Sequence, residues 1–130
     1  MAVTVYSSRD TQKALSEHFT VRDFLCPDGA AEVPVDGDLI CLLERLYDAL
    51  SCTQIKVTAG YRTASYARRI NREKDVSHLH GKAADIICYG ANGLPLPTET
   101  VTDALKKLGH RGGAVWESPR CVHVDVGVSE

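Results

Sequence analysis

Two segments that lie far apart in the chain combine histidine and aspartate, and any fold of this sequence has to accommodate both. The first is His78-Leu79-His80-Gly81-Lys82-Ala83-Ala84-Asp85, and the second is His123-Val124-Asp125. A glycine and small alanines separate His78 from Asp85, so a loop can fold back and bring both to one ion at about 2.0–2.2 Å. A histidine from the second segment would complete three nitrogen and oxygen ligands, the number that catalytic zinc sites commonly use. The pattern favours a zinc hydrolase.

The second segment lies in a run that is typical of a β-strand. Side chains at positions i and i+2 of a strand point to the same face, so His123 and Asp125 project together. The valines beside and between them face the other way, toward the core: Val122, Val124 and Val126. We therefore expect polar chemistry on one face of a sheet whose other face is apolar.

Apolar spacing along the rest of the chain predicts an α+β fold, with a small antiparallel sheet and flanking helices. The strongest pattern is a 3.6-residue repeat of leucine and isoleucine, which predicts the main core helix at 36–50. In chain order, the other expected elements are a capped turn with two aromatics at 16–25, a strand at 55–58, a helix at 64–72, a strand at 83–89, a helix at 99–108 with Thr98 as its N-cap, and strands at 113–116 and 121–126.

Length and composition suit one domain that spans residues 1–130. With 44% hydrophobic residues, 25% charged residues and a formal net charge of -2, the composition is that of an ordinary globular protein, and a nucleic-acid partner is not expected. The amino terminus lacks the basic and apolar segments of a signal peptide, and no apolar run reaches membrane-spanning length. We expect a monomer that is synthesised in the cytoplasm and has no membrane partner.

The five cysteines are widely spaced, odd in number and without a C-x-x-C pair, which argues against a disulfide framework. Reduced and mostly buried thiols are expected. Cys121 lies two positions before His123 and shares its strand face, so a thiolate ligand is an alternative to a buried thiol there.

Four short patterns together resemble the peptidase M15 family of zinc D-Ala-D-Ala carboxypeptidases. They are His78-x-x-Gly81-x-Ala83-x-Asp85, His123-x-Asp125, Gly60-Tyr61-Arg62 and Phe19-Thr20-x-x-Asp23-Phe24, and they extend over about residues 16–126. The resemblance implies a hedgehog/DD-peptidase-like fold and one zinc ion held by His78, Asp85 and His123. It also implies that the substrate is a peptidoglycan stem peptide.

The same resemblance suggests how the substrate is held. It implies that Arg62, next to Tyr61, binds a carboxylate of the substrate, and an arginine fork can make two parallel charge-assisted hydrogen bonds to such a group. The alternative for Arg62 is that it only holds the corner between strand and helix through backbone carbonyls. The alternative for Tyr61 is a packing role.

The chain departs from the family pattern at two positions. Val76 stands where a serine is usual, two positions before the first histidine, and Ser77 is next to His78 instead. Arg120 stands three positions before the last histidine, where many members carry an acidic general base, and arginine cannot accept a proton. Asp125 is the first candidate to replace this base and Glu117 the second, and an orienting role for Asp125 is equally compatible with its position.

These observations predict a zinc metallopeptidase that cleaves peptidoglycan stem peptides or cross-links and acts on the cell wall. A phage or prophage lytic enzyme and a host wall-remodelling enzyme both fit this description. The alternative from another class is a zinc-stabilised, non-catalytic domain that binds peptidoglycan or peptide, which Arg120 at the position of the base would explain. In a third interpretation the same side chains bind no metal and form a polar network.

Overall fold

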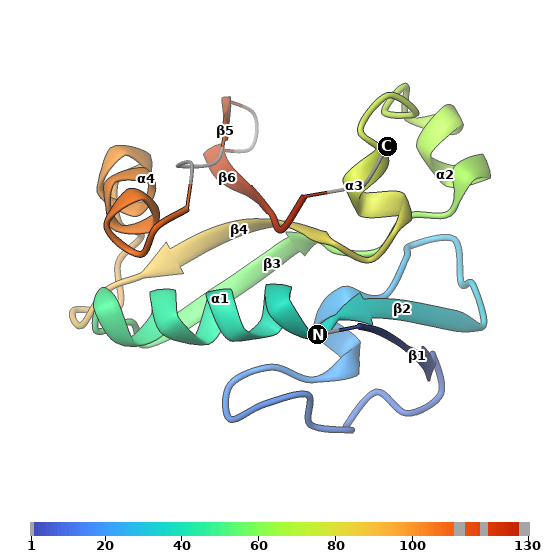
Figure 1. Cartoon of the computed structure of the whole chain (residues 1–130), viewed down its shortest axis with the longest axis horizontal. Coiled ribbons are helices and arrows are strands. Elements are labelled where there is room, and N and C mark those ends of the chain that lie inside the picture. Colours follow the sequence, from blue (N-terminus) through green and yellow to red (C-terminus); the bar gives the residue numbers. More distant parts are fainter. Residues whose placement is uncertain (1, 111–113, 118–119, 128–130) are drawn as a thin grey trace.

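An antiparallel four-stranded sheet with the strand order β3-β4-β6-β5 is at the centre of the computed structural model (Figure 1). Its strands are β3 (Gln54–Ala59), β4 (Ala83–Tyr89), β5 (Ala114–Glu117) and β6 (Arg120–Asp125). A separate two-stranded sheet pairs β1 (Val3–Ser7) with β2 (Glu32–Asp36). The structure describes residues 2–110, 114–117 and 120–127, with only the backbone for 114–117.

The helices of the described residues are short, apart from two that carry the core. They are α1 (Gly37–Ala49), α2 (Ala64–Arg69), α3 (Val76–Leu79) and α4 (Thr98–Lys107), with a 3-10 turn η1 (Val21–Phe24) near the amino terminus. Within the described ranges, none of them has both the length and the apolar character needed to cross a bilayer.

Alternation along the central strands separates an apolar face of the sheet from a polar one. In β4 the side chains of Ala84, Ile86 and Cys88 are buried in the core, together with the leucines of α1 and the apolar residues of α4. In Figure 1, α1 runs along the sheet, and α4 lies beside β4 and β6. Because successive strand residues point to opposite faces, Asp85 points away from this core. The polar face predicted from the sequence is therefore present.

The expected α+β architecture with an antiparallel sheet is confirmed, and the differences lie at element ends and in three short elements. The helix predicted at 36–50 is α1, and the Asp36 side chain accepts from the backbone N–H of Asp38 at 2.7 Å as its N-cap. The helix predicted at 64–72 ends at Arg69. Thr98 is the first residue of α4 and not its N-cap, because Pro97 already has the extended backbone of that position. Strands β1 and β2 and helix α3 were not predicted.

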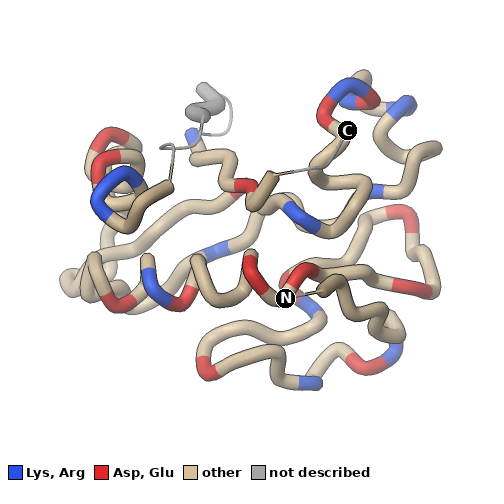
Figure 2. Tube along the Cα trace, in the orientation of Figure 1, with Lys and Arg blue, Asp and Glu red and all other residues tan. Residues whose placement is uncertain are grey.

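Positive and negative side chains are interspersed along the described chain. Figure 2 shows Lys and Arg (blue) and Asp and Glu (red) on both helices and loops, in keeping with a formal net charge of -2. Long-range attraction of a polyanion needs a field of one sign. The expectation of no nucleic-acid partner stays a prediction.

Gly81, the glycine of the first motif, is required by backbone packing. Its φ is +70°, and a Cβ built on it would lie 2.3 Å from the carbonyl oxygen of Pro34 in β2. Its own carbonyl accepts from the backbone N–H of Asp36 at 2.8 Å, and the next residue, Lys82, donates to the Asp36 carboxylate at 2.6 Å. The loop between His78 and Asp85 is thus fixed against β2 and the start of α1.

Replacing Gly81 by alanine should destabilise the protein by more than the positive φ alone explains. Left-handed backbone costs an alanine about 1–2 kcal/mol, and forcing a methyl group into occupied space adds about 1–3 kcal/mol. Gly93 is the matched control, because its φ is +77° but a Cβ added there would have no atom within 4 Å. Urea unfolding should show a clearly larger loss for Gly81→Ala than for Gly93→Ala, and equal losses would contradict the packing argument.

Candidate metal centre

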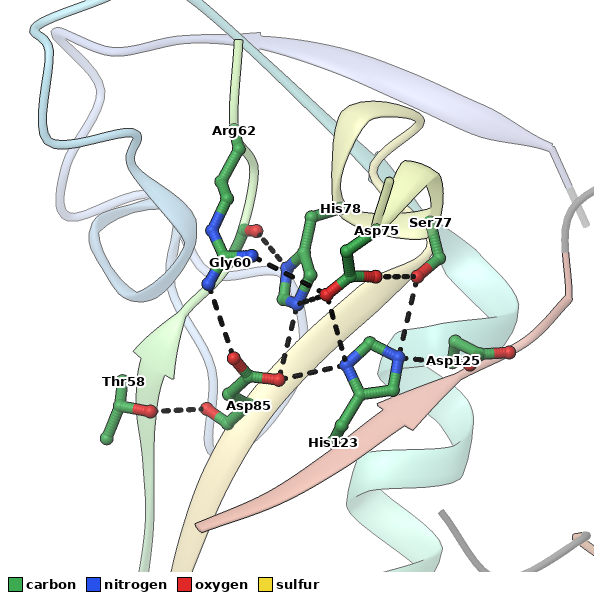
Figure 3. A network of polar contacts seen from close by, with 9 residues as sticks. All are labelled: Thr58, Gly60, Arg62, Asp75, Ser77, His78, Asp85, His123 and Asp125. Atoms are coloured by element: carbon green, nitrogen blue, oxygen red, sulfur yellow. Dashed lines mark hydrogen bonds and ion pairs between the residues drawn. The ribbon is translucent and has the colours of Figure 1, made fainter. Parts of the chain in front are cut away.

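Three strands and one short helix bring the candidate ligands together on the polar face of the sheet. Asp85 in β4 is the Cα partner of His123 in β6, and on its other side Ala59 in β3 pairs with it next to a register shift. The chain leaving β3 continues through Gly60 to Arg62, and α3 supplies His78. Figure 3 shows these side chains pointing toward one another.

The three ligands predicted from the sequence are in contact. Oδ1 of Asp85 is 3.2 Å from Nε2 of His78 and 2.9 Å from Nδ1 of His123. All three residues are buried, with exposed fractions of 0% for His78, 6% for Asp85 and 8% for His123. Residues that are seven and 38 positions apart from Asp85 in the chain therefore meet at one point of the sheet.

The hydrogen bond on the far side of the His78 ring determines which nitrogen faces this point. Nδ1 of His78 is 2.7 Å from the carbonyl oxygen of Gly60, which can only accept, so Nδ1 carries the proton. In the neutral form of this ring, Nε2 carries the lone pair and faces the Asp85 carboxylate, which is also an acceptor. Two acceptors that face each other need a proton or a cation between them. A backbone carbonyl on the outer nitrogen is a usual arrangement for a metal-binding histidine.

His123 shows the same pattern with its nitrogens exchanged. Nδ1 faces Asp85, while Nε2 is 3.1 Å from Oδ2 of Asp125 and 3.5 Å from the hydroxyl of Ser77. Burial on its own would lower the pKa of His123, but the hydrogen bond to Asp85 and the charges of the nearby aspartates outweigh burial and raise it. Likewise, burial would raise the pKa of Asp85, but the hydrogen bonds and charges of the two histidines lower it. The donor set therefore favours positive charge at its centre and fits a divalent cation.

Asp75 is a member of this centre that sequence reasoning missed. One oxygen or nitrogen from each of Asp75, His78 and His123 lies within 4.8 Å of the others, which satisfies the spacing of a metal site. Asp85 is nearer to both histidine nitrogens than Asp75 is, so the candidate centre comprises four residues. The available signal was the spacing Asp75-x-x-His78, since residues three apart on a helical turn are neighbours.

Arg62 is part of the centre and does not simply hold a corner of the backbone. Only 7% of it is exposed, and its guanidinium faces two carboxylates: Nη2 is 3.4 Å from Oδ2 of Asp85, and Nη1 is 3.6 Å from Oδ2 of Asp75. Nη1 is buried and has no hydrogen-bond partner among the described atoms. Arg62 therefore orients the carboxylates and retains a donor for a further acceptor.

A pocket of about 240 Å³ adjoins the centre at Arg62. It lies between β3, the segment that follows η1, and α2, and Tyr61 lines it together with Arg62 and Tyr66. Tyr61 is partly buried and packs against the core cluster, so a packing role and a place at the pocket are both seen for it. The pocket and the candidate ligands share Gly60 and Arg62 as a common wall.

The two candidates for the general base are placed very differently. Asp125 contacts Nε2 of His123, on the side of the ring that points away from Asp85, which is the place of an orienting carboxylate. The side chain of Glu117 lies outside the described residues. Arg120, which stands at the usual position of the base, is exposed at the start of β6.

The cysteines agree with the expectation of reduced, mostly buried thiols. All five are free, and four of them are buried. Burial raises the pKa of Cys121, and the nearby Asp85 charge adds to this effect. Cys121 is not part of the group of described residues whose spacing suits a metal, which favours the buried thiol considered from the sequence.

Comparison with protein families assigns the chain. The family model described as Peptidase M15 matches residues 17–125, which is most of the 130 residues. The chain belongs to the peptidase M15 family, whose members are typically metal-dependent. No match was found among curated proteins or among solved structures.

Removing a ligand should abolish the response of the protein to zinc. A metal that binds only the folded state stabilises it by about 2.7 kcal/mol at one hundred times its dissociation constant. Purified protein should therefore unfold at a higher temperature with zinc than with a chelator, and His78→Ala, Asp85→Ala and His123→Ala should not. His80→Ala is the control, because His80 is exposed and lies in the same motif. An unchanged zinc response in His123→Ala would exclude this metal centre.

Proposed function

We propose that the protein is a zinc-dependent peptidase that cleaves stem peptides or cross-links of peptidoglycan. The single observation that carries the proposal is the convergence of His78, Asp85 and His123 in a chain of the peptidase M15 family. Two imidazole nitrogens and one carboxylate oxygen are a usual ligand set for catalytic zinc. The place of action that we propose is the cell wall, for a phage-encoded lytic enzyme or for an enzyme of the host.

The residues around the ligands orient them for this role. Bound zinc would polarise the scissile carbonyl and lower the pKa of its water from about 15.7 to about 7. The carbonyl of Gly60 fixes the ring of His78, and Asp125 and Ser77 fix the ring of His123 from the opposite side. Such outer contacts typically change metal affinity or activity by about 10–100-fold.

Arg62 and the adjoining pocket support the proposed substrate. Nη1 of Arg62 is a buried cationic donor that pairs with Asp75 at 3.6 Å but has no hydrogen bond among the described atoms, and a carboxylate is the acceptor that an arginine binds best. A volume of about 240 Å³ suits the end of a short peptide and not an extended polymer. We propose that a carboxylate of the stem peptide binds Arg62, with Tyr61 at the side of the pocket.

Purified peptidoglycan is the direct test of this function. Zinc-loaded protein should release peptide fragments that mass spectrometry identifies, and the identity of the fragments defines the bond that is cleaved. His123→Ala should release none, because it lacks a ligand, while His80→Ala should match the wild type. If the zinc-loaded wild type binds peptidoglycan but releases nothing, the alternative of a non-catalytic binding domain, favoured by Arg120 at the position of the base, replaces the proposal.

A pair of substitutions at Asp125 separates the base from the orienting role. Asparagine can still accept a hydrogen bond from Nε2 of His123 but cannot take a proton from water. If Asp125 orients the ring, as its contact with Nε2 supports, Asp125→Asn should keep most of the turnover, and Asp125→Ala should lose about 10–100-fold in zinc affinity.

The opposite outcome is equally clear for this pair. If Asp125 is the general base, both variants should lose about 10²–10⁴-fold in kcat while they retain zinc. Zinc affinity measured by competition with a chromophoric chelator, together with kcat on the released fragments, distinguishes the two roles.

A further inference from the structure

We infer that Asp75 is a fourth protein ligand of the metal in the substrate-free protein, and that it has to leave this position before a substrate can occupy it. The inference rests on the proposed metal centre and adds a residue that the sequence pattern did not include. As a consequence, protein ligands occupy all four coordination positions at rest, and substrate binding vacates one of them.

Four distances from the two histidine nitrogens to carboxylate oxygens are comparable with the ligand separations of a tetrahedral site. Ligands at about 2.0–2.1 Å from a tetrahedrally coordinated zinc lie about 3.3–3.4 Å from one another. Oδ1 of Asp85 is 3.2 and 2.9 Å from the nitrogens of His78 and His123, and Oδ2 of Asp75 is 3.6 and 3.9 Å from the same two atoms. The two distances to Asp85 are shorter than this ideal separation, and the two distances to Asp75 are longer. Asp75 is therefore near enough to both histidine nitrogens to share an ion with them.

Asp75 covers the side of the centre that solvent can reach. The exposed fraction of its side chain is 21%, whereas the side chains of His78, Asp85 and His123 are exposed by 0%, 8% and 10%. Catalytic zinc sites leave one position to water or substrate, while sites with four protein ligands are typically structural. A carboxylate on the open side of a three-ligand site thus makes the resting site resemble a structural one.

The contacts that hold Asp75 are few, and one of them is shared with the proposed substrate. The hydroxyl of Ser77 donates to Oδ1 at 3.1 Å, and Nη1 of Arg62 lies 3.6 Å from Oδ2. Asp75 precedes the single turn of α3 and makes no side-chain hydrogen bond that caps it. A substrate carboxylate that binds Nη1 of Arg62 competes directly with Asp75, while Asp85 keeps its separate contact with Nη2. Substrate binding would therefore release Asp75 from Arg62 and favour its departure from the fourth coordination position.

Binding of azide to the cobalt-loaded, full-length protein tests the inference by visible absorption, without any turnover. If Asp75 holds the position for about nine-tenths of the time, azide should bind the wild type about tenfold more weakly than Asp75→Ala. Loss of a ligand should also weaken zinc binding by about tenfold or more. Glu73→Ala is the matched control, because it removes a carboxylate from an exposed residue two positions away and should leave both affinities unchanged.

Each outcome decides between the two levels of the proposal. Equal azide affinity in wild type and Asp75→Ala, with metal retained in both, would overturn the role of Asp75 and leave the proposed peptidase intact. A wild type that binds neither zinc nor cobalt would overturn both. Asp75→Asn serves as a second variant if the alanine variant does not fold, since it keeps an acceptor for Ser77 and removes the charged ligand. Tighter azide binding in either variant, but not in Glu73→Ala, supports the inference.

Discussion

The position of β4 between β3 and β6 brings Asp85, His123 and the segment that carries Arg62 together in the candidate metal centre. Asp85 is paired with His123 on one side and lies next to Ala59 on the other. Because side chains alternate along a strand, a shift by one residue would replace Asp85 on the polar face by Ala84 or Ile86. Both of these side chains are buried against the core formed with α1 and α4, which opposes such a shift. The geometry of the polar face is thus a consequence of packing on the apolar face.

A second constraint is the excess of acceptors at one buried point. Carboxylates and the lone pair of a neutral imidazole repel one another in a medium from which water is largely excluded, and burying them is costly unless a cation compensates. Arg62 compensates from behind Asp85, and the raised pKa of His123 shows that a proton is favoured there too. A divalent cation at the centre would supply positive charge at the same point.

The features that could be predicted from the sequence are those that follow a regular pattern of residue types and spacing. Helix α1 follows from its leucine spacing, and the meeting of His78, Asp85 and His123 follows from a motif of fixed residue types and spacing; their role as metal ligands stays a prediction. Strands β1 and β2 escaped prediction because β1 is largely exposed and β2 contains Pro34, which argues against a strand in the middle of a sheet.

The contacts of Asp75 and Arg62 escaped prediction for a different reason. An aspartate three positions before a histidine is meaningful only if a helical turn forms there, and α3 has just four residues. The pairing of Arg62 with two carboxylates joins the segment after β3 to Asp75 and to Asp85 in β4, which no local pattern encodes. Both are properties of the assembled fold and not of a segment.

The residues of the first motif are required for two different reasons, one of packing and one of chemistry, and Gly81 belongs to the first. His78 and Asp85 of this motif are candidate metal ligands, whereas its glycine is required because the carbonyl oxygen of Pro34 in β2 leaves no room for a Cβ. A relative of this protein without the two candidate ligands would still need the glycine for as long as this loop packed against β2. In a diverged sequence, a glycine at this position would therefore indicate the same fold, whereas only the two histidines and the aspartate would indicate the same chemistry.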